Sequence, residues 1–392
     1  MKIVDLQVIP FWVPHKPVQV PPFWALRKPY RHGETLPETK VVQTVTKIIT
    51  DEGAEGYHFG SRGMSVEQRA DLEGPIKSLV LRQDPYDREK FWHWMWVAKI
   101  PENLISMLDM ALWDLQGRAF GVPVHKLLGG CRGKVKAYAS TSDSLGDPEV
   151  YAQHALECKG KGYKAYKIHP PYYFFDPISK RPDLGRPSPV EQQIATCRLV
   201  REAVGDDMVL MYDAYGTYRT YEEALKVGRA LEELNFYWFE HPMQEYCVKA
   251  YIKLAAELEV PILSPELTPG SLYTRADWIL RGASDMSRID GSLGGITGCH
   301  KTAAICEAFG LKLELHGAGF GNLQILGATS EDVCEYYERG LLAPGVDYET
   351  PPPYWEEICD PLDSDGYVRV PQKPGMGYKI NWDYINDNLA EE

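Results

Sequence analysis

The chain has 392 residues, of which 44% are hydrophobic and 25% are charged, and its formal net charge is −13. This length favours one large domain with a smaller one, and the composition is that of an ordinary soluble globular protein. The negative charge and the lack of a basic run argue against nucleic acid or an anionic membrane as a partner, and no apolar stretch reaches the roughly 20 residues that span a bilayer.

Two further features predict a cytoplasmic location. The N-terminal segment MKIVDLQVIPFWVP alternates like a strand and lacks the small-residue cleavage site of a signal peptide. The eight cysteines are scattered without a C-x-x-C pair. This distribution is typical of reduced thiols rather than of a disulfide scaffold or a zinc site.

The first 130 residues predict an α+β domain. A strand over residues 1–12 precedes an irregular segment rich in proline and aromatic residues, and residues 40–61 predict a β-rich stretch with a turn at 51–53. A helix then covers the start of ALWDLQGRAFGVPVHKLLGG (111–130) and the residues before it. Its apolar positions recur at helical spacing, and Gly121-Val122-Pro123 ends it; these positions are Ile105, Leu108, Leu112 and Leu115.

From residue 131 to about 370, short apolar strands alternate with helices. This rhythm predicts a parallel sheet, either doubly wound or closed into a barrel. No phosphate-binding G-x-G-x-x-G motif follows the first strand of this region, and the number of strand–helix units approaches eight. The pattern therefore favours an α/β fold with a (β/α)8 barrel of the TIM type.

Polar residues recur at one place in five successive strand–helix units. Their separations of 27, 26, 24 and 26 residues are about the length of one unit; they are Asp213, Glu240, Glu266, Asp290 and His316. Each is predicted at the C-terminal tip of its strand, the end that carries the active site in such barrels. Three neighbouring carboxylates would repel one another without a cation, and hard oxygen ligands favour magnesium over zinc. We therefore expect Asp213, Glu240 and Glu266 to bind one Mg²⁺ per subunit.

Two pairs beside these acids predict proton transfer. Asp290 and His316 lie on adjacent strands, so the carboxylate can hold one ring nitrogen and leave the other as a base. One strand before the acids, Lys167 and His169 in AYKIHPP are two residues apart and therefore share a strand face. A lysine beside a metal-bound anion stabilises negative charge or acts as a base with a lowered pKa.

Together these residues resemble the mandelate racemase and muconate-lactonizing branch of the enolase superfamily over essentially the whole chain. The resemblance is carried by the strand-tip residues and by the segments ALWDLQGRAFGVPVHKLLGG, DGSLGGITG, LELHGAGFGN and PGMGYKINWDYI. It implies a modified (β/α)8 barrel over residues 131–370, an N-terminal capping domain over 1–130, and a C-terminal segment 371–392 that returns to the capping domain. It also implies Mg²⁺ on the three acids and abstraction of the proton next to a substrate carboxylate, a pattern of this superfamily.

The sequence departs from this family at two places. Many relatives carry Lys-x-Lys where this chain has Lys167-Ile168-His169, and often Asn where it has Tyr215. A two-base racemase of the Lys/His kind is therefore less favoured. We expect His316, oriented by Asp290, to be the base, Lys167 to stabilise the enediolate, and His169 to protonate a departing β-hydroxyl. The exchange of roles between the two histidines stays open.

Substrate contacts are expected from several loops. Glu335 lies about one unit beyond His316 and is a candidate to contact a substrate carboxylate, with Glu338 an equally plausible placement. In this family the capping-domain loops set specificity, here residues 24–33 and 56–60, and the insertion at 170–189 is a candidate lid. The candidate substrate-binding residues are Tyr30, Arg31, His32, His58, Tyr215 and Glu335.

These features favour an acid-sugar dehydratase that uses Mg²⁺ to convert an aldonate or aldarate to a 2-keto-3-deoxy acid. The alternative among enzymes is an epimerase, racemase or cycloisomerase acting on a sugar acid through the same enediolate. Outside enzymes, the alternative is a metal-stabilised homologue without turnover. A homo-oligomer, from dimer to octamer, is expected because such assemblies are common among relatives.

Overall fold

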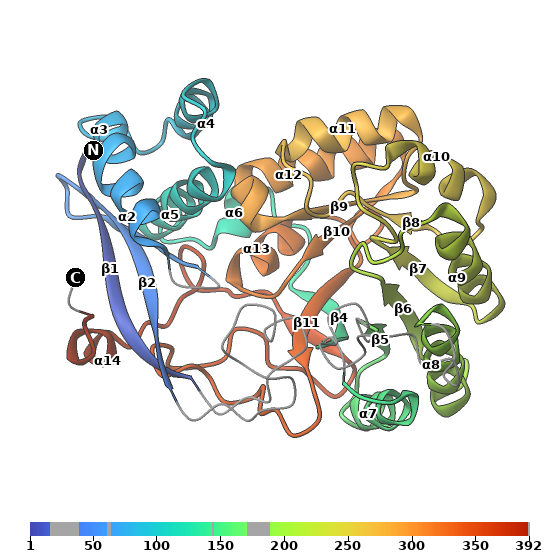
Figure 1. Cartoon of the computed structure of the whole chain (residues 1–392). Helices are drawn as coiled ribbons and strands as arrows, with labels where there is room; N and C mark the ends of the chain where they lie inside the picture. The colour runs from blue at the N-terminus through green and yellow to red at the C-terminus, as the bar shows by residue number, and fades with distance from the viewer. Residues whose placement is uncertain (16–38, 61–63, 143–144, 171–188, 391–392) are drawn as a thin grey trace.

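The computed structural model describes residues 1–15, 39–60, 64–142, 145–170 and 189–390. The candidate residues Tyr30, Arg31 and His32 and most of the predicted lid lie outside these ranges. An antiparallel sheet with helices stands on one side of the molecule and a parallel barrel on the other (Figure 1). No helix in the described ranges is long and apolar enough to cross a bilayer.

The N-terminal domain contains an antiparallel sheet in the order β1-β2-β3. Its strands are β1 (Ile3–His15), β2 (Thr39–Thr50) and β3 (Glu55–Phe59). The predicted turn is confirmed: Gly53 N donates to Thr50 O at 3.1 Å, and Gly53 has a φ of +80°. The domain also contains helical segments, namely α2 (Val66–Asp71), a π-helical turn (Leu72–Ile76), α3 (Lys77–Val80), α4 (Arg88–Val97), α5 (Glu102–Phe120) and α6 (Val124–Leu127). Helix α5 packs against β2 and β3, and the π-helical turn and α3 contact β1.

Helix α5 confirms the helix predicted from the apolar spacing. The four predicted positions are buried in the core between α5 and the sheet. The helix ends at Gly121, whose left-handed backbone (φ +70°) is the usual conformation of a helix C-terminal cap.

Within the described ranges, eight parallel strands form the barrel, in the order β10-β9-β8-β7-β6-β5-β4-β11. At the closing seam, Leu313 N donates to Val333 O at 2.7 Å. The strands are β4 (Lys134–Thr141), β5 (Ala165–Ile168), β6 (Val209–Asp213), β7 (Phe236–Glu240), β8 (Ile262–Leu263), β9 (Met286–Asp290), β10 (Lys312–His316) and β11 (Tyr336–Leu342). The predicted barrel is confirmed.

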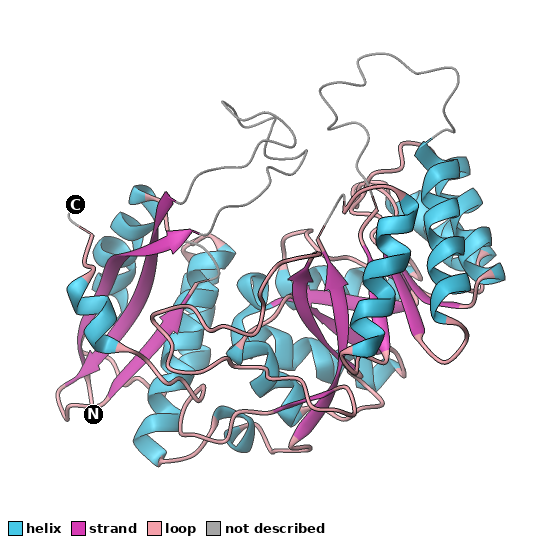
Figure 2. Cartoon of the chain, turned by 90° about the horizontal axis from the view of Figure 1, so that it is seen from below, coloured by secondary structure: helices cyan, strands magenta, loops and turns pink. Residues whose placement is uncertain are grey.

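Helices surround the barrel, as Figure 2 shows for its outer wall. They are α7 (Pro148–Gly160), α8 (Pro189–Val204), α9 (Tyr221–Glu233), α10 (Val248–Glu257), α11 (Ser271–Arg281), α12 (Gly291–Phe309) and α13 (Phe320–Ala328). After β11 the chain runs through residues 343–366 to β12 (Tyr367–Arg369), which pairs antiparallel with β4. Side chains of alternating strand positions, such as Met211, Trp238 and Leu263, fill the interior of the barrel.

The C-terminal segment packs on the N-terminal domain. Helix α14 (Trp382–Asp387) lies beside β1 (Figure 1), and Asp114 of α5 accepts hydrogen bonds from Tyr57 N at 2.9 Å and Met376 N at 2.8 Å. Gly375 precedes this contact with a φ of +73°, and a Cβ there would lie 2.2 Å from Asp114 Oδ1. A glycine is therefore needed for this approach. The domain boundaries at 130 and 370 stay predictions.

Candidate metal centre and active site

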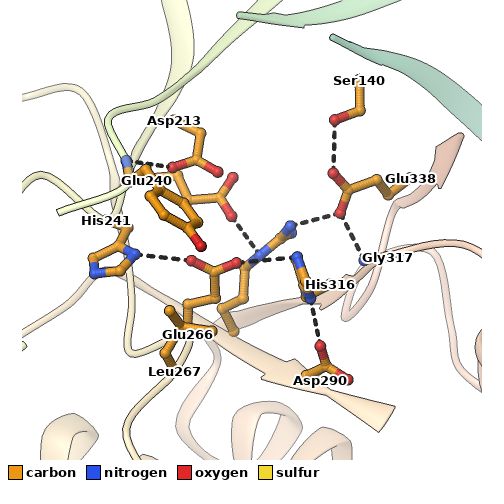
Figure 3. Close-up of polar contacts among 12 residues, drawn as sticks. Ser140, Asp213, Glu240, His241, Glu266, Leu267, Asp290, His316, Gly317 and Glu338 are labelled. Carbon is orange, nitrogen blue, oxygen red and sulfur yellow. Dashed lines mark hydrogen bonds and ion pairs between the residues drawn. The ribbon is translucent and has the colours of Figure 1, made fainter. Parts of the chain in front are cut away.

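The strand tips bring the predicted polar residues to one end of the barrel (Figure 3). Asp213 and Glu240 are paired in register at the ends of β6 and β7, as are Asp290 and His316 at the ends of β9 and β10. Glu266 follows three residues after the short strand β8. All five groups therefore face one site, as expected for the C-terminal ends of parallel strands.

A cluster that one metal ion can reach contains two of the three predicted acids. Ligand atoms of Asp213, His241 and Glu266 lie within 4.8 Å of one another, and the side chains are buried. His241 Nδ1 lies 2.9 Å from Glu266 Oε2. Glu240 is engaged differently: Oε1 lies 2.5 Å from Arg288 Nε and Oε2 lies 3.0 Å from Lys167 Nζ. The cluster thus includes His241, which sequence reasoning missed although it directly follows Glu240.

The charge balance of the site fits a divalent cation. The site holds two permanent positive charges, on Lys167 and Arg288, and five buried or nearly buried carboxylates. Three of these carboxylates contact Lys167 or Arg288, namely Asp213, Glu240 and Glu338, and the other two, Glu266 and Asp290, contact His316. Burial raises the pKa of Glu240 to about 7, even though Arg288 lies against it. These carboxylates outnumber the two permanent cations and require further positive charge, which protonated histidines or a divalent cation can supply; oxygen-rich donor sets are those that Mg²⁺ prefers.

Asp290 and His316 form the predicted dyad. His316 Nδ1 lies 2.5 Å from Asp290 Oδ2, and Asp290 Oδ1 also accepts from Ser292 N at the start of α12. Burial alone would lower the pKa of His316, but Glu266 and Asp290 raise it to about 10. His316 Nε2 faces Glu266 Oε1 at 3.2 Å, and about a third of its side chain (35%) is exposed. The proton on Nδ1 is therefore fixed by Asp290, and Nε2 is the nitrogen available to a substrate.

Lys167 is a buried ammonium group held by carboxylates. Its Nζ lies 3.0 Å from both Glu240 Oε2 and Glu338 Oε1 and 3.5 Å from Asp213 Oδ2. Burial and Arg288 would lower its pKa, but the surrounding carboxylates raise it well above the ordinary value. Lys167 is therefore suited to stabilise negative charge and unsuited to act as a base.

His169 contacts an acceptor at each ring nitrogen. Nδ1 lies 2.7 Å from Thr141 O and Nε2 lies 2.9 Å from Asp213 Oδ2. Both contacts are satisfied together when the ring carries two protons. Burial would lower the pKa of His169, but the charge of Asp213 raises it. The ring is thus held as a proton carrier next to the candidate metal cluster.

The structure corrects the placement of Glu335. This residue precedes β11 at the N-terminal end of the barrel, opposite the site, where it pairs with Lys136 at 3.0 Å and Lys312 at 2.7 Å. Glu338 is the glutamate that reaches the site. It contacts Lys167, accepts from Ser140 Oγ and Gly317 N at 2.7 Å each, and is buried.

Arg288 is a second functional residue that sequence reasoning missed. Its guanidinium is fully buried and bridges Glu240 to Glu338, with its terminal nitrogen 2.7 Å from Glu338 Oε2. The signal was present in the strand MSRID, because Arg288 lies two residues before Asp290 and so shares its inward face.

A cavity of about 780 Å³ opens beside the dyad. It is lined by Asp290 and His316, by residues of α5 including Asn103 and Ser106, and by half-buried aromatic residues that include Phe59, Tyr354, Trp355 and Tyr378. His58 also lines it, as the prediction of a substrate contact requires. Burial lowers the pKa of His58 to about 4, and its Nδ1 has no hydrogen-bond partner among the described residues.

Tyr215 contacts two residues of the candidate metal cluster. Its backbone N donates to Asp213 Oδ1 at 2.8 Å, its φ is +53°, and its ring centroid is 6.0 Å from that of His241. The hydrogen bond from the Tyr215 backbone fixes the Asp213 carboxylate. A substrate contact of the Tyr215 side chain stays a prediction.

Comparison with known proteins places the chain in a family. The family pattern described as enolase C-terminal domain-like matches residues 150–384, and the mandelate racemase / muconate lactonizing enzyme N-terminal domain matches residues 18–129. The chain belongs to the mandelate racemase and muconate-lactonizing family of the enolase superfamily. The resemblance expected from the sequence is confirmed.

Relatives in this family include enzymes named for acid sugars. Arabinonate dehydratase of Saccharolobus solfataricus is 30% identical, covering 91% of this chain and 92% of its own. The crystal structure of D-glucarate dehydratase from Agrobacterium tumefaciens complexed with magnesium is 34% identical, with a TM-score of 0.86 and full coverage of both chains. D-galactarolactone cycloisomerase of Agrobacterium fabrum is 28% identical, covering 88% of this chain and 90% of its own.

Proposed function

We propose that this enolase-superfamily chain is a Mg²⁺-dependent acid-sugar dehydratase, a carbon–oxygen hydro-lyase. It removes the proton next to the carboxylate of an aldonate or aldarate and eliminates the β-hydroxyl as water, giving a 2-keto-3-deoxy acid. One observation carries the proposal: a proton-transfer dyad opens to a large cavity beside a buried cluster of acids that fits a divalent cation. Relatives named arabinonate and D-glucarate dehydratase support the substrate class.

Asp213, Glu240 and Glu266 hold the Mg²⁺ in this proposal. Carboxylate oxygens are the ligands that Mg²⁺ prefers, and Glu240 is the register partner of Asp213. His241 then keeps its Nδ1 as a hydrogen-bond donor that orients Glu266. Bound Mg²⁺ supplies positive charge that stabilises the enediolate formed when the substrate loses its proton.

The ligand assignment has a direct test in Mg²⁺ binding measured by calorimetry. Glu240→Gln is expected to weaken binding more than His241→Asn, because the first removes a ligand and the second only a hydrogen-bond donor. If His241→Asn weakens binding more strongly, the cation is held by the cluster of Asp213, His241 and Glu266 instead.

The protein side chains divide the proton transfers between them. Glu266 is the main group that raises the pKa of His316, and Mg²⁺ held by Glu266 would offset this charge and free Nε2 of its proton. His316 then takes the α-proton on Nε2, while Asp290 holds Nδ1–H and keeps the ring in position. His169 donates a proton to the departing β-hydroxyl, because hydroxide is a poor leaving group and the ring is held in its protonated form. Lys167 adds positive charge at the enediolate, and Glu338 fixes Lys167.

Polar groups along the cavity fit a polyhydroxy substrate. His58, Asn103 and Ser106 line the cavity, and the buried Nδ1 of His58 has no hydrogen-bond partner among the described residues. We assign these three residues to substrate hydroxyls. Tyr30, Arg31, His32 and the side chain of Tyr215 remain candidates for the same role, as the sequence predicts.

An isomerase is the second candidate. The observation that favours it is the presence of two proton carriers, His316 and His169, near one metal cluster, and D-galactarolactone cycloisomerase is among the relatives. Exchange of a substrate proton with solvent deuterium, without release of a keto acid, would identify this activity.

A substrate screen tests the proposed function. The metal-depleted protein is incubated with a panel of aldonates and aldarates, with and without Mg²⁺, and keto acids are detected with semicarbazide. Keto acid from at least one sugar acid is expected, only with Mg²⁺, and not with the His316→Asn variant. Full activity of the His316→Asn variant would show that His316 is not the base. A chain that Mg²⁺ stabilises but that converts no sugar acid would be a non-catalytic homologue.

Assembly and location complete the proposal. We infer a homo-oligomer, from dimer to octamer, which sedimentation analysis would size directly. We also infer a cytoplasmic protein; all eight cysteines, which lie in the described ranges, are free thiols, and this supports a reducing compartment.

A further inference from the structure

The segment that carries Glu266 extends beyond the end of its strand. Strand β8 has two residues, and its ladder with β9 contains the single pair Leu263 and Met286. Glu266 lies three residues farther along, and the next residue, Leu267, is 44% exposed. Neither the sheet nor apolar packing of Leu267 therefore fixes the Glu266 carboxylate in place.

Glu245 binds the backbone of this segment. It lies in the loop between β7 and α10 and is 6% exposed. Its Oε1 accepts from Glu266 N, and its Oε2 accepts from Leu267 N at 3.1 Å, Thr268 N at 2.6 Å and Thr268 Oγ1 at 2.5 Å. Hydrogen bonds to an ionised acceptor are roughly twice as strong as neutral ones, so one buried carboxylate holds three consecutive residues.

Arg275 binds the same segment through its carbonyl groups. The fully buried guanidinium donates to Glu266 O at 2.8 Å, Thr268 O at 2.7 Å and Pro265 O at 3.3 Å. At the far end of the segment, Glu102 of α5 accepts from Gly270 N at 2.6 Å and Ser271 N at 3.1 Å. The segment is thus held through its backbone by the barrel and by the N-terminal domain.

We propose that Glu245 is a positioning residue that places the Glu266 carboxylate for the divalent cation and so sets the affinity for that cation. This inference rests on the proposed role of Glu266 as a metal ligand. A carboxylate is required at position 245 because all the facing groups are donors. A glutamine would turn an NH₂ group toward one set of them and would push the segment away.

The chain offers a matched control for this role. Glu232 binds the backbone at the opposite end of β8, where its Oε1 contacts Glu259 N and, at 3.4 Å, Val260 N. Glu245→Gln and Glu232→Gln therefore make the same chemical change at the two ends of one strand, and only the first lies beside Glu266.

Calorimetric titration of the full chain with Mg²⁺ alone tests the inference. Glu245→Gln is expected to raise the Kd for Mg²⁺ by about 10- to 100-fold, the usual effect of removing a partner of a metal ligand, while Glu232→Gln keeps the wild-type Kd. With sugar acid present, kcat of Glu245→Gln should return toward wild type at saturating Mg²⁺, because the ligand set is intact.

A folded Glu245→Gln variant with the wild-type Kd would overturn the inference, and so would an equal rise in Kd for Glu232→Gln. If Glu245→Gln does not fold, Thr268→Val carries the test: it removes one donor to Glu245, and an unchanged Kd would count against the role. A wild-type chain that binds Mg²⁺ but dehydrates no sugar acid refutes the proposed reaction and leaves this inference standing.

Discussion

Arg288→Met is expected to destabilise the protein more strongly than the loss of a surface ion pair. Arg288 is fully buried, with contacts of 2.5 Å to Glu240 and 2.7 Å to Glu338. Methionine retains much of the apolar volume but leaves both carboxylates without this partner. An exposed ion pair contributes about 0–1 kcal/mol, whereas breaking a buried pair from one side costs about 3–5 kcal/mol.

The remaining contacts place the expected loss within that range. Lys167 still lies 3.0 Å from Glu240 and from Glu338, so neither acid becomes entirely unpaired. The loss in free energy of unfolding is therefore expected at the lower end, about 3 kcal/mol. Mg²⁺ should recover part of it, because the cation binds only the folded chain and adds charge next to Glu240.

Urea unfolding in EDTA, followed by circular dichroism, measures this loss. The double variant Arg288→Met/Glu240→Gln should be more stable than Arg288→Met alone, because it removes one of the two carboxylates that have lost Arg288 and share Lys167. A loss below about 1 kcal/mol for Arg288→Met, the range of surface pairs, would refute the assignment of Arg288 as the buried counter-charge of the site.

Three further predictions concern the base, the two glutamates of β11 and a buried acid of α5. His316→Asn should lower the rate of dehydration by about 100- to 10,000-fold, the contribution of a general base. It should also abolish exchange of the α-proton with deuterium and leave the Kd for Mg²⁺ unchanged. A variant that still exchanges this proton would show that another residue is the base. Glu338→Gln should lower kcat by about 100-fold, because Lys167 and Gly317 lose the carboxylate that holds them. Glu335→Gln should keep the wild-type kcat. The reverse result would show that Glu335, and not Glu338, belongs to the site. Burial raises the pKa of Asp109 from 3.8 to about 6, so the native state keeps a proton that the unfolded chain loses between these pH values. Stability from this group is therefore present below about pH 4 and is lost as pH rises through 6, by about 3 kcal/mol in total. In urea unfolding between pH 4 and 7, Asp109→Asn should remove that slope, and an unchanged slope would exclude Asp109 as its source.

Much of the fold followed from the sequence because one repeat length controlled it. The interval between Asp213, Glu240 and Glu266 matches one strand–helix unit, so the acids were expected at the same end of the barrel; Asp213 and Glu240 end their strands, and Glu266 lies three residues beyond β8. The dyad followed for the same reason, since Asp290 and His316 occupy consecutive units, and the structure pairs them in register. Helix α5 could also be predicted from the sequence, because its apolar residues recur at a helical spacing that a strand does not have.

Other features depended on contacts that a linear pattern does not display. Glu335 and Glu338 differ by three positions, and the start of β11 between them puts one at each end of the barrel. The alternation of inward- and outward-facing side chains along YYERG would have identified Glu338 only if the first residue of β11 had been known. The partner of Glu240 was also hidden, because Arg288 approaches it from two strands away within the sheet, and Glu245 binds backbone groups that carry no sequence signal.

The deuterium content of the product made in D₂O tests the central claim most directly. In this account His316 removes the C2 proton with Mg²⁺ present, water leaves from C3, and ketonisation then takes a proton from solvent at C3. Nuclear magnetic resonance of the keto acid should show one deuterium at C3, and no product should form in EDTA or with Asp213→Asn. Keto acid formed at an undiminished rate in EDTA, or formed without deuterium at C3, would contradict the account.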